Sequence, residues 1–180
     1  KAAGELLAQQ MIEAIGNEGQ VAIMSYVAGV GSEIGRVGGF RDYIEANSDI
    51  EVVNTLYSQS QMATALNQTT DVLSAYPELD GIFGANEPTA VGMARAIVQA
   101  GREDTLFALG FDGNEDLQQF VRDGVLDAIA VQGSFQMGEL GVQTIVNLIA
   151  GETVEDFINT GVVLVTADNI DSEEAQNVLY

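Results

Sequence analysis

A regular alternation of short apolar runs with helical patterns is the feature that most constrains how this chain can fold. The apolar runs are centred near residues 23, 53, 83, 108 and 129, and a helical pattern follows each of the first four. A short, continuous apolar run is typical of a strand covered on both faces, and strands that alternate with helices pair in parallel through right-handed crossovers. The sequence therefore predicts an α/β fold with a doubly wound parallel sheet, in three layers and in the strand order 2-1-3-4-5.

The last third of the chain departs from this alternation. Residues 134–150 predict a helix with a broad apolar arc, and residues 161–166 predict a further strand. The arc consists of Met137, Leu140, Val142, Ile145, Leu148 and Ile149. Such an arc needs more partner surface than one face of a sheet gives, so we expect this helix to pack on something outside the chain.

The residue types that are absent exclude most catalytic chemistry. The chain has no His and no Cys, and Lys1 is its only lysine. Histidine bases, Ser–His and Cys–His nucleophile pairs, ordinary zinc sites and phosphate-loop lysines are therefore excluded. Carboxylate chemistry stays open in principle, but with 27 acidic residues chance pairs are expected everywhere. We expect a protein that is not an enzyme and that uses no cofactor and no metal.

The net charge of −21 limits the partners. An acidic surface of this kind repels nucleic-acid phosphates and anionic membranes. It also fits either good solubility or adaptation to high salt, and the scarcity of lysine favours the second. No apolar run approaches the ~20 residues of a membrane span. The chain starts in a helical pattern without a signal peptide, so we expect that a leader was removed or that a longer protein contains this chain.

Residues 81–92, GIFGANEPTAVG, predict a buried strand, a sharp turn and a helix that Pro88 opens at its first position. Ligands of parallel α/β sheets bind at the carboxyl ends of the strands. Asn86 is the first polar residue past such an end. It is a candidate ligand-binding residue, although an asparagine in this place also serves as a turn or cap residue.

Three other polar residues are predicted at the same edge of the sheet. Arg36 follows the loop after the first strand, Asp112 follows the fourth strand, and Gln132 follows the fifth. Such a set of donors and acceptors without a nucleophile suits the hydroxyl groups of a neutral polar ligand such as a sugar. Asp112 could accept from two hydroxyls and Arg36 could donate to two. Asp112 is equally a turn signal with the glycine after it, and Arg36 equally a structural ion-pair partner.

Five motifs in register resemble a known family. They are RVGGF at residues 36–40, GIFGANEPTAVG at 81–92, ALGFDG at 108–113, AVQ at 130–132 and TGVVLVT at 160–166. The chain resembles the pentose- and hexose-binding proteins of bacterial ABC importers, the ribose-binding-protein-like type I periplasmic binding proteins. Repressors related to the lactose repressor share this fold.

The resemblance implies two lobes joined by three crossing segments, with a sugar bound between them. It implies that Arg36, Asn86, Asp112 and Gln132 hydrogen-bond sugar hydroxyls. Ser60 stands where ribose-binding relatives have an aromatic stacking residue, which leaves open whether the sugar is ribose.

The resemblance also implies a division of the chain. Residues 1–132 would form the C-terminal ligand-binding lobe, and residues 133–160 a helix and segment that pack on an absent N-terminal lobe. Residues 161–180 would form the return crossing strand and a tail.

The implied function is that of a periplasmic or extracellular substrate-binding protein for a sugar or polyol, with a membrane permease as its partner. A chemoreceptor role is open beside the transport role. The alternative is the effector-binding domain of a sugar-responsive repressor. The charge of −21 favours an exported protein, because a repressor has to approach DNA.

Overall fold

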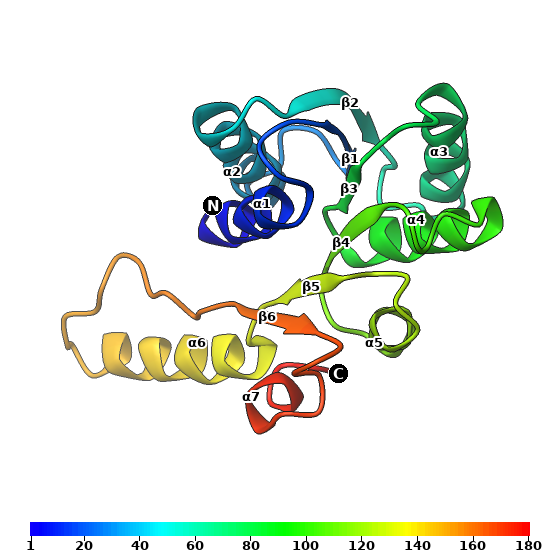
Figure 1. Cartoon of the computed structure of the whole chain (residues 1–180). Coiled ribbons are helices and arrows are strands. Elements are labelled where there is room, and N and C mark those ends of the chain that lie inside the picture. The colour runs from blue at the N-terminus through cyan, green and yellow to red at the C-terminus, as the bar shows by residue number, and fades with distance from the viewer.

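One mixed sheet of six strands organises the structure, a computed structural model that describes residues 1–180 (Figure 1). The strands are β1 (Gln20–Ser25), β2 (Glu51–Tyr57), β3 (Gly81–Gly84), β4 (Phe107–Phe111), β5 (Ala128–Val131) and β6 (Val163–Thr166). The helices are α1 (Ala2–Ile15), α2 (Gly31–Asn47), α3 (Met62–Ala75), α4 (Glu87–Ala100), α5 (Glu115–Arg122), α6 (Ser134–Ile149) and α7 (Glu173–Gln176).

The strand order is β2-β1-β3-β4-β5-β6. Strands β1 to β5 pair in parallel, which confirms the predicted order 2-1-3-4-5. Strand β6 extends the sheet by pairing antiparallel to β5, with Val131 opposite Val163 and Ala128 opposite Thr166. The carboxyl ends of β1 to β5 therefore all lie at one edge of the sheet.

Helices cover both faces of the sheet and make three layers (Figure 1). Neighbouring residues of a strand point to opposite faces, so Ile82 joins the core under α3, α4 and α5, and Phe83 joins the core under α1 and α2. Phe40 of α2 stacks on Phe83 with ring centroids 4.8 Å apart. Helix α4 can lie close to α3 because a Cβ at Gly92 would collide with the carbonyl oxygen of Met62.

The helix starts agree with the sequence to within one residue except for α2, which begins at Gly31, two residues before the predicted start at Glu33. Helix α4 begins at Glu87, so Pro88 is its second residue and not its first, and Asn86 occupies the N-cap position. The first and the second residue of a helix both lie in its first turn, where the missing N–H of proline costs no helical bond. Asn114 caps α5 as predicted, because its Oδ1 accepts from the backbone N–H of Leu117 at 3.0 Å.

Helix α6 projects from the rest of the chain and buries none of its residues (Figure 1). Its exposed apolar side chains are Phe135, Val142, Ile145, Val146, Leu148 and Ile149. The broad apolar arc thus has no cover within the chain, and its packing on something outside the chain stays a prediction. No helix in the structure has both the length and the apolarity that crossing a membrane requires.

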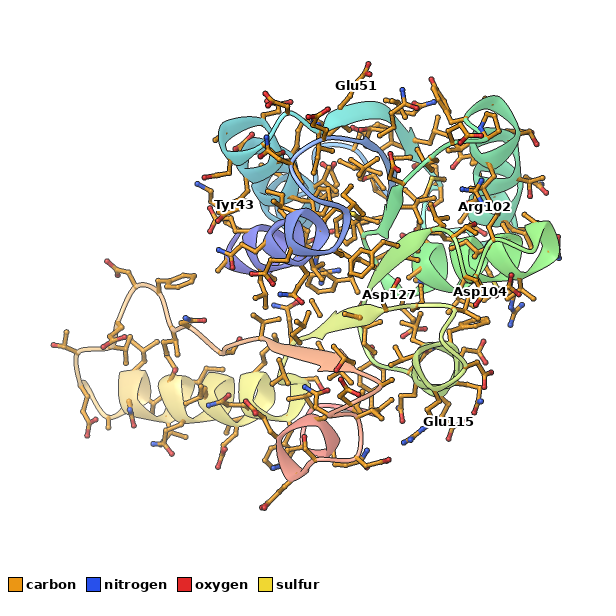
Figure 2. All side chains as sticks on the ribbon, in the orientation of Figure 1. Tyr43, Glu51, Arg102, Asp104, Glu115 and Asp127 are labelled. Carbon is orange, nitrogen blue, oxygen red and sulfur yellow. The ribbon has the colours of Figure 1, made fainter.

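Acidic residues are exposed on different parts of the molecule, and four of them, Asp80, Glu103, Asp104 and Asp127, line one pocket. Glu51, Asp104 and Glu115 are exposed on three different parts of the molecule (Figure 2).

Candidate ligand-binding site

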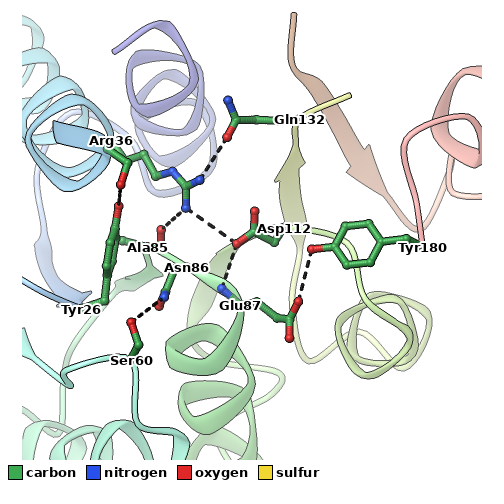
Figure 3. Close-up of polar contacts among 10 residues, drawn as sticks. Tyr26, Arg36, Ser60, Ala85, Asn86, Glu87, Asp112, Gln132 and Tyr180 are labelled. Carbon is green, nitrogen blue, oxygen red and sulfur yellow. Dashed lines mark hydrogen bonds and ion pairs between the residues drawn. The ribbon is translucent and has the colours of Figure 1, made fainter. Parts of the chain in front are cut away.

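The side chains of Arg36, Asp112 and Gln132 meet at the carboxyl edge of the sheet, as predicted (Figure 3). Arg36 Nη2 donates to Gln132 Oε1 at 3.0 Å, and Arg36 Nη1 donates to the carbonyl oxygen of Ala85 at 3.0 Å. Arg36 Nη1 also lies 3.7 Å from Asp112 Oδ2. The arginine thus joins residues that follow three different strands.

Two aromatic rings flank the guanidinium of Arg36. Its Cζ lies 3.7 Å from the ring centroid of Phe111 and 5.9 Å from that of Tyr26. Phe111 is completely buried, and the Tyr26 hydroxyl donates to Ser32 Oγ at 2.7 Å. A guanidinium over an aromatic face is attracted by the ring and held in one plane. Only two of its five N–H groups make hydrogen bonds to the protein, so donors remain for a ligand.

Asp112 has a structural bond in addition to its place in the site. Its Oδ2 accepts from the backbone N–H of Glu87 at 3.0 Å, and so satisfies the first free N–H of α4. Asn86, the N-cap residue of that helix, makes no side-chain cap bond. The two interpretations of Asp112, as a turn residue and as a site residue, therefore do not exclude each other. Oδ2 keeps a second lone pair and Oδ1 makes no hydrogen bond within the chain, so Asp112 still has acceptor sites for ligand hydroxyls.

Asn86 lies beside Ser60 at the same edge. Asn86 Nδ2 donates to Ser60 Oγ at 3.1 Å, and Asn86 Oδ1 is buried without a hydrogen-bond partner. Ser60 and Gln59 both have φ of 55°, a left-handed conformation that is uncommon for residues other than glycine. An unpartnered buried carbonyl oxygen costs about 1–3 kcal/mol. Strain and an orphaned acceptor therefore coincide at the place where a ligand is expected.

Sequence reasoning missed two polar residues that adjoin Asp112. The Tyr180 hydroxyl donates to Glu87 Oε2 at 3.2 Å (Figure 3). Tyr180 keeps 55% of its exposure, but partial burial, and then the negative charges of Asp112 and Glu87, raise its pKa to about 12. The position of Glu87 directly after Asn86 was a usable signal. Nothing in the sequence indicated that Tyr180, in the tail, returns to this edge.

The arrangement offers hydrogen-bond donors and acceptors and no activated nucleophile. The chain contains no group of three or more carboxylates placed to hold a metal ion. What the geometry supports is the binding of a molecule with several hydroxyl groups.

This chain is similar to a family of periplasmic binding proteins and to known import binding and solute-binding proteins. The periplasmic binding protein domain family matches residues 1–153. The ribose import binding protein RbsB of Escherichia coli is 31% identical over 158 residues, which are 86% of this chain and 50% of that protein. The chain thus spans about half the length of the curated relatives it matches.

Two solved structures are similar over 99% of this chain. An ABC transporter solute-binding protein from Agrobacterium vitis with bound D-fucose has a TM-score of 0.96 and 67% identity, and 62% of that protein is covered. A carbohydrate transporter solute-binding protein from Agrobacterium radiobacter in complex with D-arabinose has a TM-score of 0.94 and 30% identity, with 63% covered.

Proposed function

The chain belongs to the periplasmic binding protein domain family, and we propose that it is the C-terminal lobe of a sugar-binding protein that serves an ABC importer. Its relatives are import binding proteins and solute-binding proteins and not enzymes. The lobe would bind the sugar without converting it, in the periplasm or outside the cell, and deliver it to a membrane permease. The repressor alternative has no support of this kind.

The main support for the proposal is that the protein itself holds the side chain of Arg36 in place at the strand ends. Arg36 is fixed by Gln132, by the Ala85 carbonyl oxygen and by the ring of Phe111. A binding site formed in advance loses little conformational freedom when the ligand binds. The free N–H groups of Arg36 could donate to sugar hydroxyls, and Asp112 Oδ1 could accept from a neighbouring hydroxyl of the same sugar.

We propose D-fucose, or a neutral sugar closely related to it, as the ligand. This rests on the protein from Agrobacterium vitis, which has D-fucose bound and is 67% identical to this chain. Asn86 and Gln132 would contact the sugar through their amides. Ser60 would orient the amide of Asn86, to which it is hydrogen-bonded. A serine in this place provides no aromatic platform for a sugar face.

The second lobe would complete the site from the other side. In this proposal residues 1–132 form the C-terminal lobe, and residues 133–160, with the exposed apolar face of α6, pack on an N-terminal lobe. Residues 161–180 return from that crossing, and their strand β6 rejoins the sheet beside β5. Closure of the two lobes over the sugar is the change that the permease would detect.

Calorimetric titration of the intact protein with D-fucose, D-arabinose, D-ribose and D-allose tests the function. We expect micromolar or tighter binding of D-fucose by the intact protein, and no better than millimolar binding by the 180-residue chain alone, which lacks the opposing contacts. Asp112→Asn should weaken binding at least tenfold, about 1.4 kcal/mol. The matched control is Asp116→Asn, whose exposed carboxylate pairs with Arg95. Binding of no sugar by the intact protein, or equal affinities for the two variants, would refute the proposal.

A further inference from the structure

Tyr180 closes a ring of hydrogen bonds around Asp112 (Figure 3). The Tyr180 hydroxyl donates to Glu87 Oε2 at 3.2 Å, and the backbone N–H of Glu87 donates to Asp112 Oδ2 at 3.0 Å. The backbone N–H of Tyr180 donates to the carbonyl oxygen of Gly113 at 3.2 Å, next to Asp112 in the chain. The ring joins the start of α4, the loop after β4 and the tail, three segments far apart in the sequence.

The backbone of the tail is held at this loop independently of the phenol hydroxyl. Gln118 Nε2 donates to the carbonyl oxygen of Gly113 at 2.9 Å and to that of Tyr180 at 3.2 Å. Leu179 and Val131 lie so close to Gly113 that a Cβ there would be 2.9 Å from each of them. Loss of the hydroxyl alone should therefore leave the tail in place, which makes its contribution separable from packing.

Asp112 is a residue whose conformation has to be enforced. Its φ is +77°, and a non-glycine residue persists in that region only where its surroundings hold it there. The backbone N–H of Asp112 donates to the carbonyl oxygen of Ala130 at 3.0 Å on one side. Tyr180 supplies the restraint on the other side, through Gly113 and through Glu87.

The phenol hydroxyl also contacts a second carboxylate at this edge, that of Glu87. Burial, and then the charges of Asp112 and Glu87, hold the pKa of Tyr180 above its usual value, and its hydroxyl donates to Glu87 Oε2 at 3.2 Å. At neutral pH the phenol is a neutral donor that holds the Glu87 carboxylate. Without the hydroxyl, the Glu87 carboxylate would lose this hydrogen bond.

We propose that Tyr180 is a positioning residue for sugar binding, which fixes the orientation of the Asp112 carboxylate through Glu87 and Gly113. It does so without having to touch the sugar. The inference rests on the proposed function, because it takes Asp112 to be a sugar ligand.

The experiment compares Tyr180→Phe with the wild type in the intact protein. The substitution removes one hydroxyl, and calorimetry should show D-fucose binding about three- to tenfold weaker, as expected for one lost hydrogen bond. Tyr43→Phe is the matched control, because it loses a hydroxyl that accepts from Gln9 Nε2 between α1 and α2, away from the site. Its affinity should stay within about twofold of the wild type.

The same substitution in an Asp112→Asn background separates positioning from general stability. If Tyr180 acts through Asp112, Tyr180→Phe should weaken binding less than about twofold in that background. An equal loss in both backgrounds would overturn the proposal, and so would an unchanged affinity of Tyr180→Phe for D-fucose.

A readout without sugar makes the two proposals independently testable. Hydrogen exchange of the Glu87 amide, followed by NMR, should be about tenfold faster in Tyr180→Phe, since the partner of its hydrogen bond loses a restraint. If the intact wild type binds no D-fucose, the proposed ligand is wrong and this exchange rate alone decides the inference. Faster exchange would then support the positioning role, and equal exchange in the two proteins would overturn it.

Discussion

Replacing Arg36 by methionine should lower the free energy of unfolding by about 2–4 kcal/mol, since this side chain joins three strand ends as well as forming the candidate site. Methionine keeps an apolar stem of similar length but has no guanidinium. The substitution removes the hydrogen bonds to Ala85 and Gln132, the ion pair with Asp112 and the contact with Phe111.

The magnitude follows from how far each contact is buried. A hydrogen bond made by a charged group contributes about 1.5–3 kcal/mol, and removing one partner of a buried ion pair costs about 3–5 kcal/mol. The side chains of Arg36 and Asp112 keep 17% and 23% of their exposure, so the ion pair contributes less than a fully buried one. Packing of the methionine on Phe111, and relief from burying a charge, offset part of the loss. The expected net loss in the free energy of unfolding is therefore about 2–4 kcal/mol.

Urea unfolding followed by circular dichroism at neutral pH measures this difference. The matched control is Arg122→Met, which breaks a pair with Asp171 that has two short contacts, of 2.7 and 3.1 Å, on the exposed surface. Screening by water makes such pairs weak, so this variant should unfold close to the wild type. Wild-type stability of Arg36→Met, or equal losses in the two variants, would refute the reasoning.

Three further predictions follow from the packing, the charge and the phenol. Gly4→Ala should lose about 1–3 kcal/mol in urea unfolding, because its Cβ would collide with the carbonyl oxygen of Arg36 and lie 2.8 Å from Phe40 N. Gly38→Ala on α2, with no atom within 4 Å of the new Cβ, should instead gain about 0.5–1 kcal/mol. Raising NaCl from about 0.1 to about 1 M should increase the unfolding free energy, because the screening length falls from ~10 to ~3 Å around a chain of net charge −21; a decrease would contradict this. In an ultraviolet titration one tyrosine of five should ionise at about pH 12, and Tyr180→Phe should abolish that step. Because the pKa of Tyr180 is raised in the folded state, its stabilising contribution should be complete below the unfolded pKa of about 10 and be lost as the pH rises to about 12. Persistence of that last step in Tyr180→Phe would show that another tyrosine is responsible.

The sequence by itself determined the parallel sheet and the edge at which polar residues gather. Apolar runs such as residues 81–84 and the helical patterns between them are local signals, and alternation of the two permits little except parallel pairing. Once the strands run in parallel, every residue that follows a strand end is brought to the same edge. Arg36, Asp112 and Gln132 could therefore be brought together before any contact between them was known.

Tertiary structure alone decided what those residues do to one another. In the folded chain Asp112 also accepts a hydrogen bond from the first N–H of α4. The amide of Asn86 donates to Ser60. The tertiary structure also placed Phe111 under the guanidinium and brought Tyr180 to Glu87. The reason is physical: periodicity reports which face of an element is buried, but a hydrogen bond depends on dihedral angles and on atoms that distant segments supply. The stretch GIFGANEP thus indicated a candidate ligand-binding edge, and only the folded chain showed which of its polar atoms have no partner within the protein.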